Sequence, residues 1–213
     1  MQTALAIAIS YLLGSIPTGD IAARLRGVDI RSVGSGNPGF TNVLRTLGPR
    51  AAAPVLAVDI AKGLAAVLFV AGALGAVSPL GPTGVRLAAG LAAVAGSIWP
   101  VFARFKGGRG VAVACGVFGA MAPLATLAAV LLWLAIVLTS RYVSLGSVTA
   151  AAFLPWAIWY ESRLVGTERP TALTLTALLV AIVVVVRHRA NIGRLLNGTE
   201  NRFGRSPEKG EER

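Results

Sequence analysis

Long runs of apolar residues dominate the chain, and short segments rich in glycine and arginine separate them. A helix needs about 20 apolar residues to cross the roughly 30 Å hydrocarbon core of a membrane. Five runs reach or approach that length: residues 3–24, 52–77, 85–105, 148–159 with its extension, and 173–186. Residues 111–139 are too many for one span and contain Met-Ala-Pro near the middle, so we divide them into two short tilted helices. The pattern predicts an all-α, polytopic membrane protein with seven transmembrane helices and glycine-rich loops on the cytoplasmic side.

The composition agrees with a membrane location. Of 213 residues, 55% are hydrophobic and 14% are charged, and the mean hydropathy is +0.72. A soluble core of this size could not bury so much apolar surface. The formal net charge of +11 would suggest a nucleic-acid partner, but the basic residues lie between apolar runs, so we expect none. The single cysteine, Cys115, excludes a disulfide framework and a cysteine-rich metal site.

The positions of lysine and arginine predict the orientation of the chain. With seven spans, one face receives the basic segments around residues 24–50, 104–109, 141 and 187–213, and the other receives only Arg86, Arg163 and Arg169. Cytoplasmic loops carry the excess of these residues. We therefore place the N-terminus outside a cell (plasma or inner) membrane and the C-terminus in the cytoplasm. Residues 1–198 form a single integral membrane domain, and residues 199–213 form a charged cytoplasmic tail.

Residues 32–45, Ser-Val-Gly-Ser-Gly-Asn-Pro-Gly-Phe-Thr-Asn-Val-Leu-Arg, have the character of an anion site. The glycines satisfy G-x-G-x-x-G, but no strand precedes them, so we reject a dinucleotide-binding loop. Glycine lets backbone N–H groups turn inward, Thr41 or Asn42 can cap a short helix, and Arg45 adds a cation one turn later. The alternative is a flexible interfacial turn with solvated polar residues.

Residues 105–110, Phe-Lys-Gly-Gly-Arg-Gly, form a second candidate between two predicted spans. The order of residues excludes a Walker A loop, in which lysine follows the last glycine. Nevertheless, three glycines flanked by Lys106 and Arg109 open onto a helix at Val111, which supplies backbone donors, a positive helix end and cations. The alternative is an ordinary basic loop that touches lipid headgroups.

Residues 188–200 form the third candidate and contain the only histidine. If the last span continues as a helix, His188, Asn191 and Leu195 lie on one stripe, which can bind a polar headgroup. The alternative is a histidine whose hydrogen bonds are satisfied at the membrane interface.

Several polar residues lie within or beside the predicted spans. Asp59 and Lys62, three positions apart, predict a structural ion pair that supports the site. Asp20 follows a Gly-Ser-Ile-Pro-Thr-Gly cluster at 14–19 that would bend or interrupt the first helix. Residues 141–147 supply hydroxyl groups near a cation, which suits either phosphate binding or helix capping.

In this order, these motifs resemble the bacterial acyl-phosphate:glycerol-3-phosphate acyltransferase family (PlsY), and the match covers nearly the whole chain. The resemblance implies an enzyme with seven helices, an outside N-terminus and a cytoplasmic active site. The implied reaction transfers an acyl group from acyl phosphate to glycerol 3-phosphate and gives lysophosphatidic acid and phosphate, the first acylation of phospholipid biosynthesis. The substrates and membrane lipid are the implied partners, with no cofactor. The sequence does not indicate the acyl-chain preference or the oligomeric state.

The resemblance also implies roles for individual residues. The residues matching the catalytic set are Ser35, Arg45, Lys106, His188 and Asn191. Those matching the substrate- and phosphate-binding set are Gly36, Asn37, Gly39, Thr41, Asn42, Gly107, Gly108, Ser144 and, more weakly, Arg194. The chain departs from the family pattern at Phe40, Arg109 and Val113, which affects acyl or loop packing and leaves the cradle intact.

The residues also favour a mechanism without an activated base. Acyltransferases that use thioesters need H-x-x-x-x-D, but Gly193 occupies the aspartate position after His188. An acyl phosphate already has a good leaving group, so binding two phosphates close together and orienting the hydroxyl can supply much of the rate. We expect no covalent intermediate, and the proton leaves to a phosphate oxygen or to His188.

Three other functions fit parts of the sequence. A transporter of a small phosphorylated anion would also need basic residues beside broken helices. A lipid-binding membrane protein would catalyse nothing. A CDP-alcohol phosphotransferase would need clustered aspartates for a divalent metal, whereas the spans contain only Asp20 and Asp59, far apart, so we expect no metal site.

Overall fold

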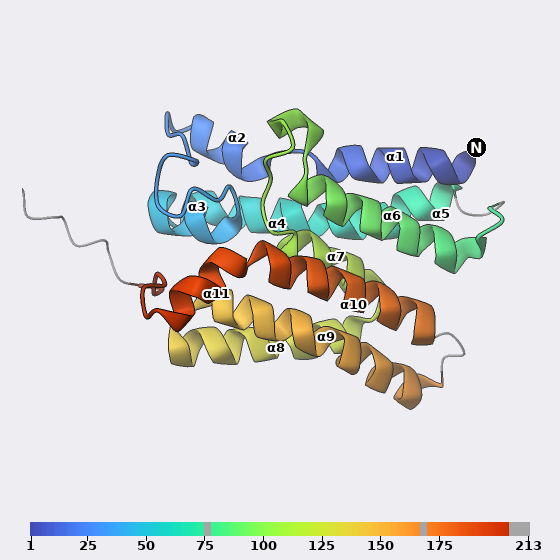
Figure 1. Cartoon of the computed structure of the whole chain (residues 1–213). Coiled ribbons are helices and arrows are strands. Elements are labelled where there is room, and N and C mark those ends of the chain that lie inside the picture. Colours follow the sequence, from blue (N-terminus) through green and yellow to red (C-terminus); the bar gives the residue numbers. More distant parts are fainter. Residues whose placement is uncertain (75–77, 167–169, 205–213) are drawn as a thin grey trace, which may run out of the picture.

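A computed structural model describes residues 1–74, 78–166 and 170–204, and these residues form helices and no strand (Figure 1). The prediction of an all-α chain is therefore confirmed. The helices are α1 (Gln2–Gly14), α2 (Thr18–Arg24), α3 (Phe40–Leu47), α4 (Pro49–Ala65), α5 (Ala71–Leu74), α6 (Gly81–Ile98), α7 (Val111–Met121), α8 (Pro123–Ser140), α9 (Val143–Val165), α10 (Pro170–Arg187) and α11 (Arg189–Leu196). A π-helical turn, Ala66–Val70, joins α4 to α5, and a 3₁₀ turn, Val101–Ala103, follows α6.

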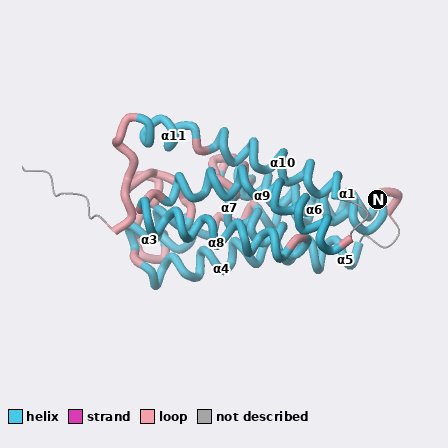
Figure 2. Tube along the Cα trace, turned by 90° about the horizontal axis from the view of Figure 1, so that it is seen from below, coloured by secondary structure: helices cyan, strands magenta, loops and turns pink. Residues whose placement is uncertain are grey.

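The long helices lie along one common direction in two groups. In Figure 1, α1, α4 and α6 form one group and α8, α9 and α10 form the other, with α7 between them. The main packing pairs are α1 with α6, α4 with α7, and α9 with both α8 and α10. Figures 1 and 2 both place α3 and α11 at the end opposite the N-terminus. The first and third polar segments of the sequence therefore lie at the same end of the molecule.

Prolines mark several helix boundaries. Pro49 and Pro123 each occupy the first turn of a helix, α4 and α8, where the missing N–H costs no hydrogen bond. The break between α7 and α8 falls at Ala122, so the predicted division of residues 111–139 is confirmed. The first span is also interrupted, because α1 ends at Gly14 and α2 begins at Thr18 after Pro17.

Within the described residues, five segments are long and apolar enough to cross a membrane: Gln2–Arg24, Pro49–Leu74, Gly81–Ala103, Pro123–Ser140 and Val143–Val165. A further pair, Thr171–Arg187 and Arg189–Leu196, is bent by 58° and counts as a broken span or a re-entrant segment. Of the two helices predicted within residues 111–139, the first corresponds to α7, whose 11 residues extend only about 16 Å. The chain is an integral membrane protein with five or six candidate spans, and a count of seven stays a prediction.

Glycines allow the closest helix crossings. A Cβ atom on Gly63 of α4 would overlap the carbonyl oxygen of Val113, and one on Gly116 of α7 would overlap that of Ile60. The crossing of α1 and α6 uses Gly14 and Gly96 in the same reciprocal way. Small residues at such crossings let helix backbones touch in a membrane, where association depends on close packing. These contacts fix the helices that carry the polar segments.

Candidate active site

A cavity of about 320 Å³ opens at the end of the molecule where the three polar segments meet. Its polar part is lined by residues such as Ser35, Arg45, Arg109, His188 and Asn191. Its remaining wall is apolar and follows α4, α7, α8, α9 and α10 into the bundle; it includes Leu56, Ile60, Val130, Leu154 and Val180. A mostly apolar pocket with a few convergent polar groups is the usual form of a small-molecule site.

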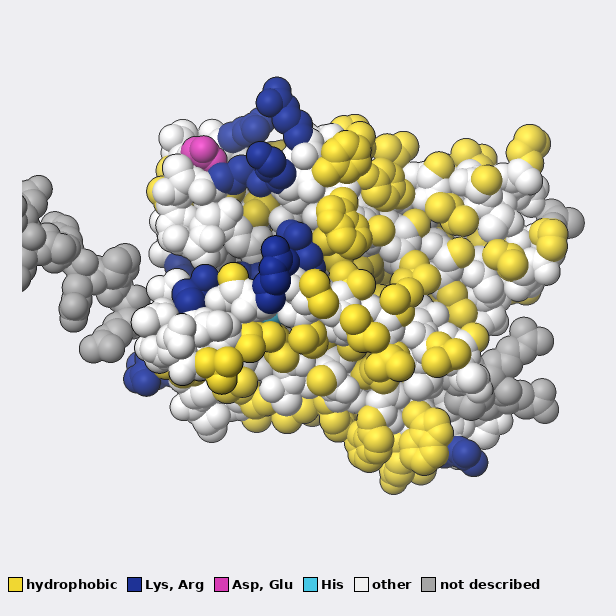
Figure 3. Space-filling view, viewed as in Figure 1, with side chains coloured by type: hydrophobic (Ala, Val, Ile, Leu, Met, Phe, Trp, Pro, Cys, Tyr) yellow, Lys and Arg dark blue, Asp and Glu magenta, His cyan; other side chains and the backbone are white. Residues whose placement is uncertain are grey.

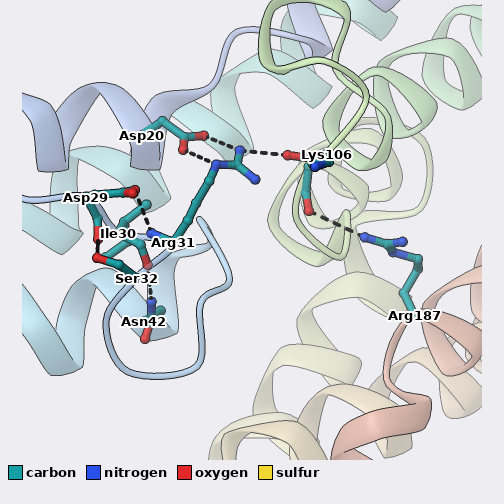
Figure 4. Close-up of polar contacts among 9 residues, drawn as sticks. Asp20, Asp29, Ile30, Arg31, Ser32, Asn42, Lys106 and Arg187 are labelled. Atoms are coloured by element: carbon teal, nitrogen blue, oxygen red, sulfur yellow. Dashed lines mark hydrogen bonds and ion pairs between the residues drawn. The ribbon is translucent and has the colours of Figure 1, made fainter.

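Asn42 organises the first polar loop. It is 1% exposed, and its amide donates to the carbonyl oxygens of Ile30 (3.1 Å) and Val33 (3.0 Å) while its Oδ1 accepts from the Ser35 N–H (2.9 Å). Part of this arrangement is drawn in Figure 4. These bonds use the polar atoms of Asn42 to hold Ser35 at the cavity wall. The predicted cap is wrong: α3 begins after Gly39, and no side chain caps it.

Arg45 projects from α3 to the cavity wall. Its Nη2 donates to the carbonyl oxygen of Asn201 (3.0 Å), whereas its buried Nε has no partner among the described residues. Burial lowers the pKa of the Arg45 guanidinium, the carboxylate of Glu200 opposes this change, and Arg194 adds to it. A buried cation with an unused donor is ready to bind an anion.

In the second loop, Arg109 rather than Lys106 reaches the cavity. Gly107, Gly108 and Arg109 line the cavity, whereas the Lys106 side chain is exposed and is not part of the lining. Burial lowers the pKa of Arg109 to about 10, and Glu200 opposes this change. Three arginines repel the charge and lower the pKa further: Arg194, Arg45 and Arg187. Arg109 therefore stays positively charged at neutral pH within a cluster of like charges that an incoming anion would stabilise.

Two guanidinium groups hold the carbonyl oxygens of this loop from opposite sides (Figure 4). Arg31 donates to the Lys106 oxygen (2.7 Å), and Arg187 donates to the Gly108 oxygen (3.1 Å). Arg31 is held in turn by both carboxylate oxygens of Asp20, at 2.8 and 2.9 Å. The structure thus gives Asp20, whose role the sequence left open, a partner that reaches the second loop.

His188 lies where α10 ends and the chain bends into α11. The two helices meet at 58°, so the condition of a continuous helix, on which the predicted stripe of His188, Asn191 and Leu195 depended, is not met. The histidine is 1% exposed, and its Nδ1 lies 2.8 Å from the Val184 carbonyl oxygen. Because a carbonyl can only accept, we assign the hydrogen to Nδ1. In the neutral ring, Nε2 then offers its lone pair toward the cavity that His188 lines.

Glu200 connects most of the remaining polar residues. Its side chain accepts hydrogen bonds from Ser144 (2.8 Å), Asn191 (2.7 Å) and Arg194 (2.7 Å). Burial alone would raise the pKa of this carboxyl, but the bonds from Asn191, Ser144 and Arg194 outweigh burial and lower it. The Asn191 Oδ1 stays buried without a partner among the described residues. Glu200 therefore fixes the third segment, and the chain still packs against the helices at residue 200. The division into a membrane domain (residues 1–198) and a tail (residues 199–213) stays a prediction.

Asp59 and Lys62 form the predicted structural ion pair. Lys62 is 3% exposed, and its Nζ lies 2.7 Å from Asp59 Oδ1. The same nitrogen donates to the carbonyl oxygen of Ile16 (2.6 Å), and Thr18 donates to Asp59 (2.6 Å). The pair therefore ties α4 to the break between α1 and α2, where unpaired backbone groups need partners.

The cavity brings together most of the predicted site residues. Those in its lining are Ser35, Asn37, Gly39, Thr41, Asn42, Arg45, Gly107, Gly108, Ser144, His188 and Asn191. Those outside it are Gly36, Lys106 and Arg194. Among the lining residues that were absent from the predicted set, Arg109 and Glu200 carry charge into the site. The sequence indicated Arg109 as a cation of the second loop, whereas the role of Glu200 depends on tertiary contacts.

The sequence matches the family described as glycerol-3-phosphate acyltransferase over residues 4–198. A glycerol-3-phosphate acyltransferase of Geobacter sulfurreducens is 48% identical over 196 residues, which cover 92% of this chain and 95% of that protein. Glycerol-3-phosphate acyltransferase 2 of Moorella thermoacetica is 49% identical over 201 residues, with 94% and 97% covered.

Two crystal structures of PlsY (YgiH), an integral membrane glycerol 3-phosphate acyltransferase, share the fold. The glycerol 3-phosphate form matches with a TM-score of 0.83 at 41% identity, and the lysophosphatidic acid form with 0.81 at 40%. Each match covers 96% of both chains. The motifs, the cavity and these likenesses agree, and the chain belongs to the glycerol-3-phosphate acyltransferase (PlsY) family.

Proposed function

We propose that this acyltransferase moves an acyl group from an acyl phosphate to glycerol 3-phosphate, giving lysophosphatidic acid and phosphate. The observation that carries the proposal is the cavity, in which the partly buried cations Arg45 and Arg109 face one end of an apolar passage. Both substrates carry a phosphate, and one also carries an apolar chain, so a site with this division of polarity suits the pair. The PlsY structures with glycerol 3-phosphate and lysophosphatidic acid support the acceptor and the product.

The cations make the encounter of two phosphates favourable. Two dianions repel each other strongly where water is scarce, and fixed positive charges offset that repulsion. Arg45 and Arg109 supply such charges inside the cavity, and the exposed Lys106, which precedes the lining residue Gly107, attracts the substrates from water. Ser35 and the amides of the first loop hold the donor phosphate, and Asn191 with its unpaired Oδ1 orients glycerol 3-phosphate.

The chemical step needs no covalent intermediate on the protein. The hydroxyl oxygen of glycerol 3-phosphate attacks the carbonyl carbon of the acyl phosphate, a new C–O ester bond forms, and the C–O bond of the mixed anhydride breaks to release phosphate. The hydroxyl proton passes to an oxygen of the leaving phosphate or to His188 Nε2, which is available because Nδ1 donates to Val184. Holding both reactants in one cavity supplies the proximity that this step requires.

The acyl chain lies in the apolar passage between the helices, and the phosphates lie at the cytoplasmic end. This placement puts the reacting atoms where water-soluble glycerol 3-phosphate and a lipid product can both reach them. It agrees with the predicted orientation, in which seven crossings of a cell membrane leave the N-terminus outside and the C-terminus inside.

Purified protein in detergent, given glycerol 3-phosphate and one donor at a time, tests the proposal. We expect lysophosphatidic acid from acyl phosphate. We expect none from the two thioester donors, acyl-coenzyme A and acylated acyl carrier protein. Product from a thioester but not from acyl phosphate would overturn the donor assignment. In liposomes, flux of glycerol 3-phosphate without a covalent product would instead identify a transporter.

A further inference from the structure

The loop at residues 106–110 has its carbonyl oxygens and its amide hydrogens on different sides. As described above, Arg31 binds the Lys106 oxygen and Arg187 binds the Gly108 oxygen. Neither arginine lines the cavity. The carbonyl oxygens of the loop are therefore drawn toward guanidinium groups that lie outside the site.

The N–H groups of the loop donate to other parts of the chain. Those of Gly107 and Gly108 donate to the carbonyl oxygens of Ile98 (3.2 Å) and Ser97 (3.1 Å), which seats the loop on the end of α6. Helix α7 then starts at Val111, and its first backbone bond runs from the Ala114 N–H to Gly110 (2.8 Å). The N–H groups at the start of α7 have no intrahelical acceptor, and these residues line the cavity.

We propose that Arg31, fixed by Asp20, is a positioning residue: it keeps the Lys106 carbonyl outside the cavity so that the substrate phosphate meets the amide hydrogens at the start of α7 and the cations. Carbonyl oxygens repel phosphate and amide hydrogens attract it, so a Lys106 carbonyl turned toward the cavity would oppose the attraction of these N–H groups. Glycine at 107 and 108 leaves the backbone free to rotate if the guanidinium is lost.

The geometry explains why the residue must be arginine. One planar guanidinium binds both oxygens of Asp20 and the Lys106 carbonyl at the same time, through Nε and Nη2. The Asp20 side chain is only 8% exposed, so little water competes with Arg31 for its carboxylate oxygens. A lysine ammonium is a point charge on a flexible stem and cannot reproduce this fork.

The test compares Arg31→Gln with Arg26→Gln. Arg26 is an arginine of the same connection between α2 and α3, and it also donates to a backbone carbonyl, that of Leu47 (2.9 Å), away from the loop. We expect Arg31→Gln to raise KM for glycerol 3-phosphate or acyl phosphate at least tenfold with kcat within about threefold, because only binding is impaired. Arg26→Gln should keep both constants. Asp20→Asn should act in the same direction, and adding it to Arg31→Gln should cause little further loss, because the two residues act as one unit.

The inference rests on the proposed function only for the identity of the phosphate. Unchanged KM for both substrates in Arg31→Gln, or a fall in kcat alone, would overturn it, as would an equal effect of Arg26→Gln. If Arg31→Gln does not fold, Arg31→Lys gives the same test, with an expected rise in KM.

If the native protein turns over no donor, the proposed function fails, and titration calorimetry with inorganic phosphate then tests the inference. Tenfold weaker phosphate binding by Arg31→Gln than by the native protein supports the positioning role, and equal binding excludes it.

Discussion

At the residue scale, the positive charges in and near the cavity differ in their burial. Arg109 and Arg45 are partly buried and line the cavity, whereas Lys106 is exposed. A charge removed from water interacts more strongly with a phosphate than one that water screens. We therefore expect the arginines to contribute more to catalysis than the lysine.

Arg45→Ala and Arg109→Ala should each lower kcat/KM at least tenfold, or roughly 1.4 kcal/mol of transition-state stabilisation. Lys106→Ala should lower it less, by about threefold, because water screens its side chain. Steady-state assays of lysophosphatidic acid formation measure these constants. Arg86→Ala, at the opposite end of α6, is the control for loss of one positive charge, and an equal loss there would contradict the location of the site.

Glu200 predicts a dependence of stability on pH. Its pKa is lower in the folded protein than in the unfolded chain, so its stabilising effect is complete above the unfolded value of about 4.3 and disappears as pH falls through the folded value. The melting temperature of the native protein in detergent should fall on acidification below about pH 5. Glu200→Gln should melt lower at neutral pH and show a weaker pH dependence. An equally steep acid response in this variant would assign the effect to other carboxylates.

Single residues also show which contacts can be predicted from the sequence and which cannot. The Asp59–Lys62 pair was predictable, because i,i+3 spacing on one helix fixes the distance between the charges. Glu200 was not, since its partners Ser144 and Asn191 reach it only through the packing of α9 and α11. The resemblance implies a substrate ligand at Asn42, and this stays a prediction. The structure adds that its bonds shape the first loop, a role that depends on backbone atoms 9 and 12 residues away.

At the element scale, the crossing of α4 and α7 depends on two glycines. Gly116→Ala would place a methyl group against the Ile60 carbonyl oxygen, so α4 and α7 would have to separate. We expect a loss of about 1–3 kcal/mol of unfolding free energy. Unfolding by denaturant in detergent micelles measures it. Gly72→Ala in α5, where an added methyl meets nothing, is the matched control and should be neutral or slightly stabilising. Equal stability of the two variants would show that the crossing tolerates separation.

Helix existence was predictable from apolar runs, but helix ends depended on local chemistry. Proline at 123 correctly indicated the division of residues 111–139, because proline cannot continue a helix without losing a hydrogen bond. No such residue marks the bend at His188, where Val184 binds the histidine ring and tertiary contacts stabilise the turn. The apolar run therefore indicated the end of α10 but not the bend that follows it.

At the scale of the whole molecule, the orientation in the membrane is open to direct test. In a Cys115→Ala background, Leu25→Cys and Leu196→Cys place a thiol at the end that carries the site, and Leu80→Cys and Val165→Cys at the other. All four side chains are exposed. In intact cells, an impermeant maleimide should label only the second pair. Labelling of Leu25→Cys and Val165→Cys from the same side would contradict the seven-span arrangement.

Glu200 follows every described helix in the order of the chain, yet it completes a site that begins at Ser35. The carboxylate that ties Ser144 to Asn191 is therefore synthesised after every described helix. A chain that stopped before residue 200 would contain all of these helices and the arginines of the cavity. It would lack the shared acceptor of Ser144 and Asn191, and we expect its site to be incomplete.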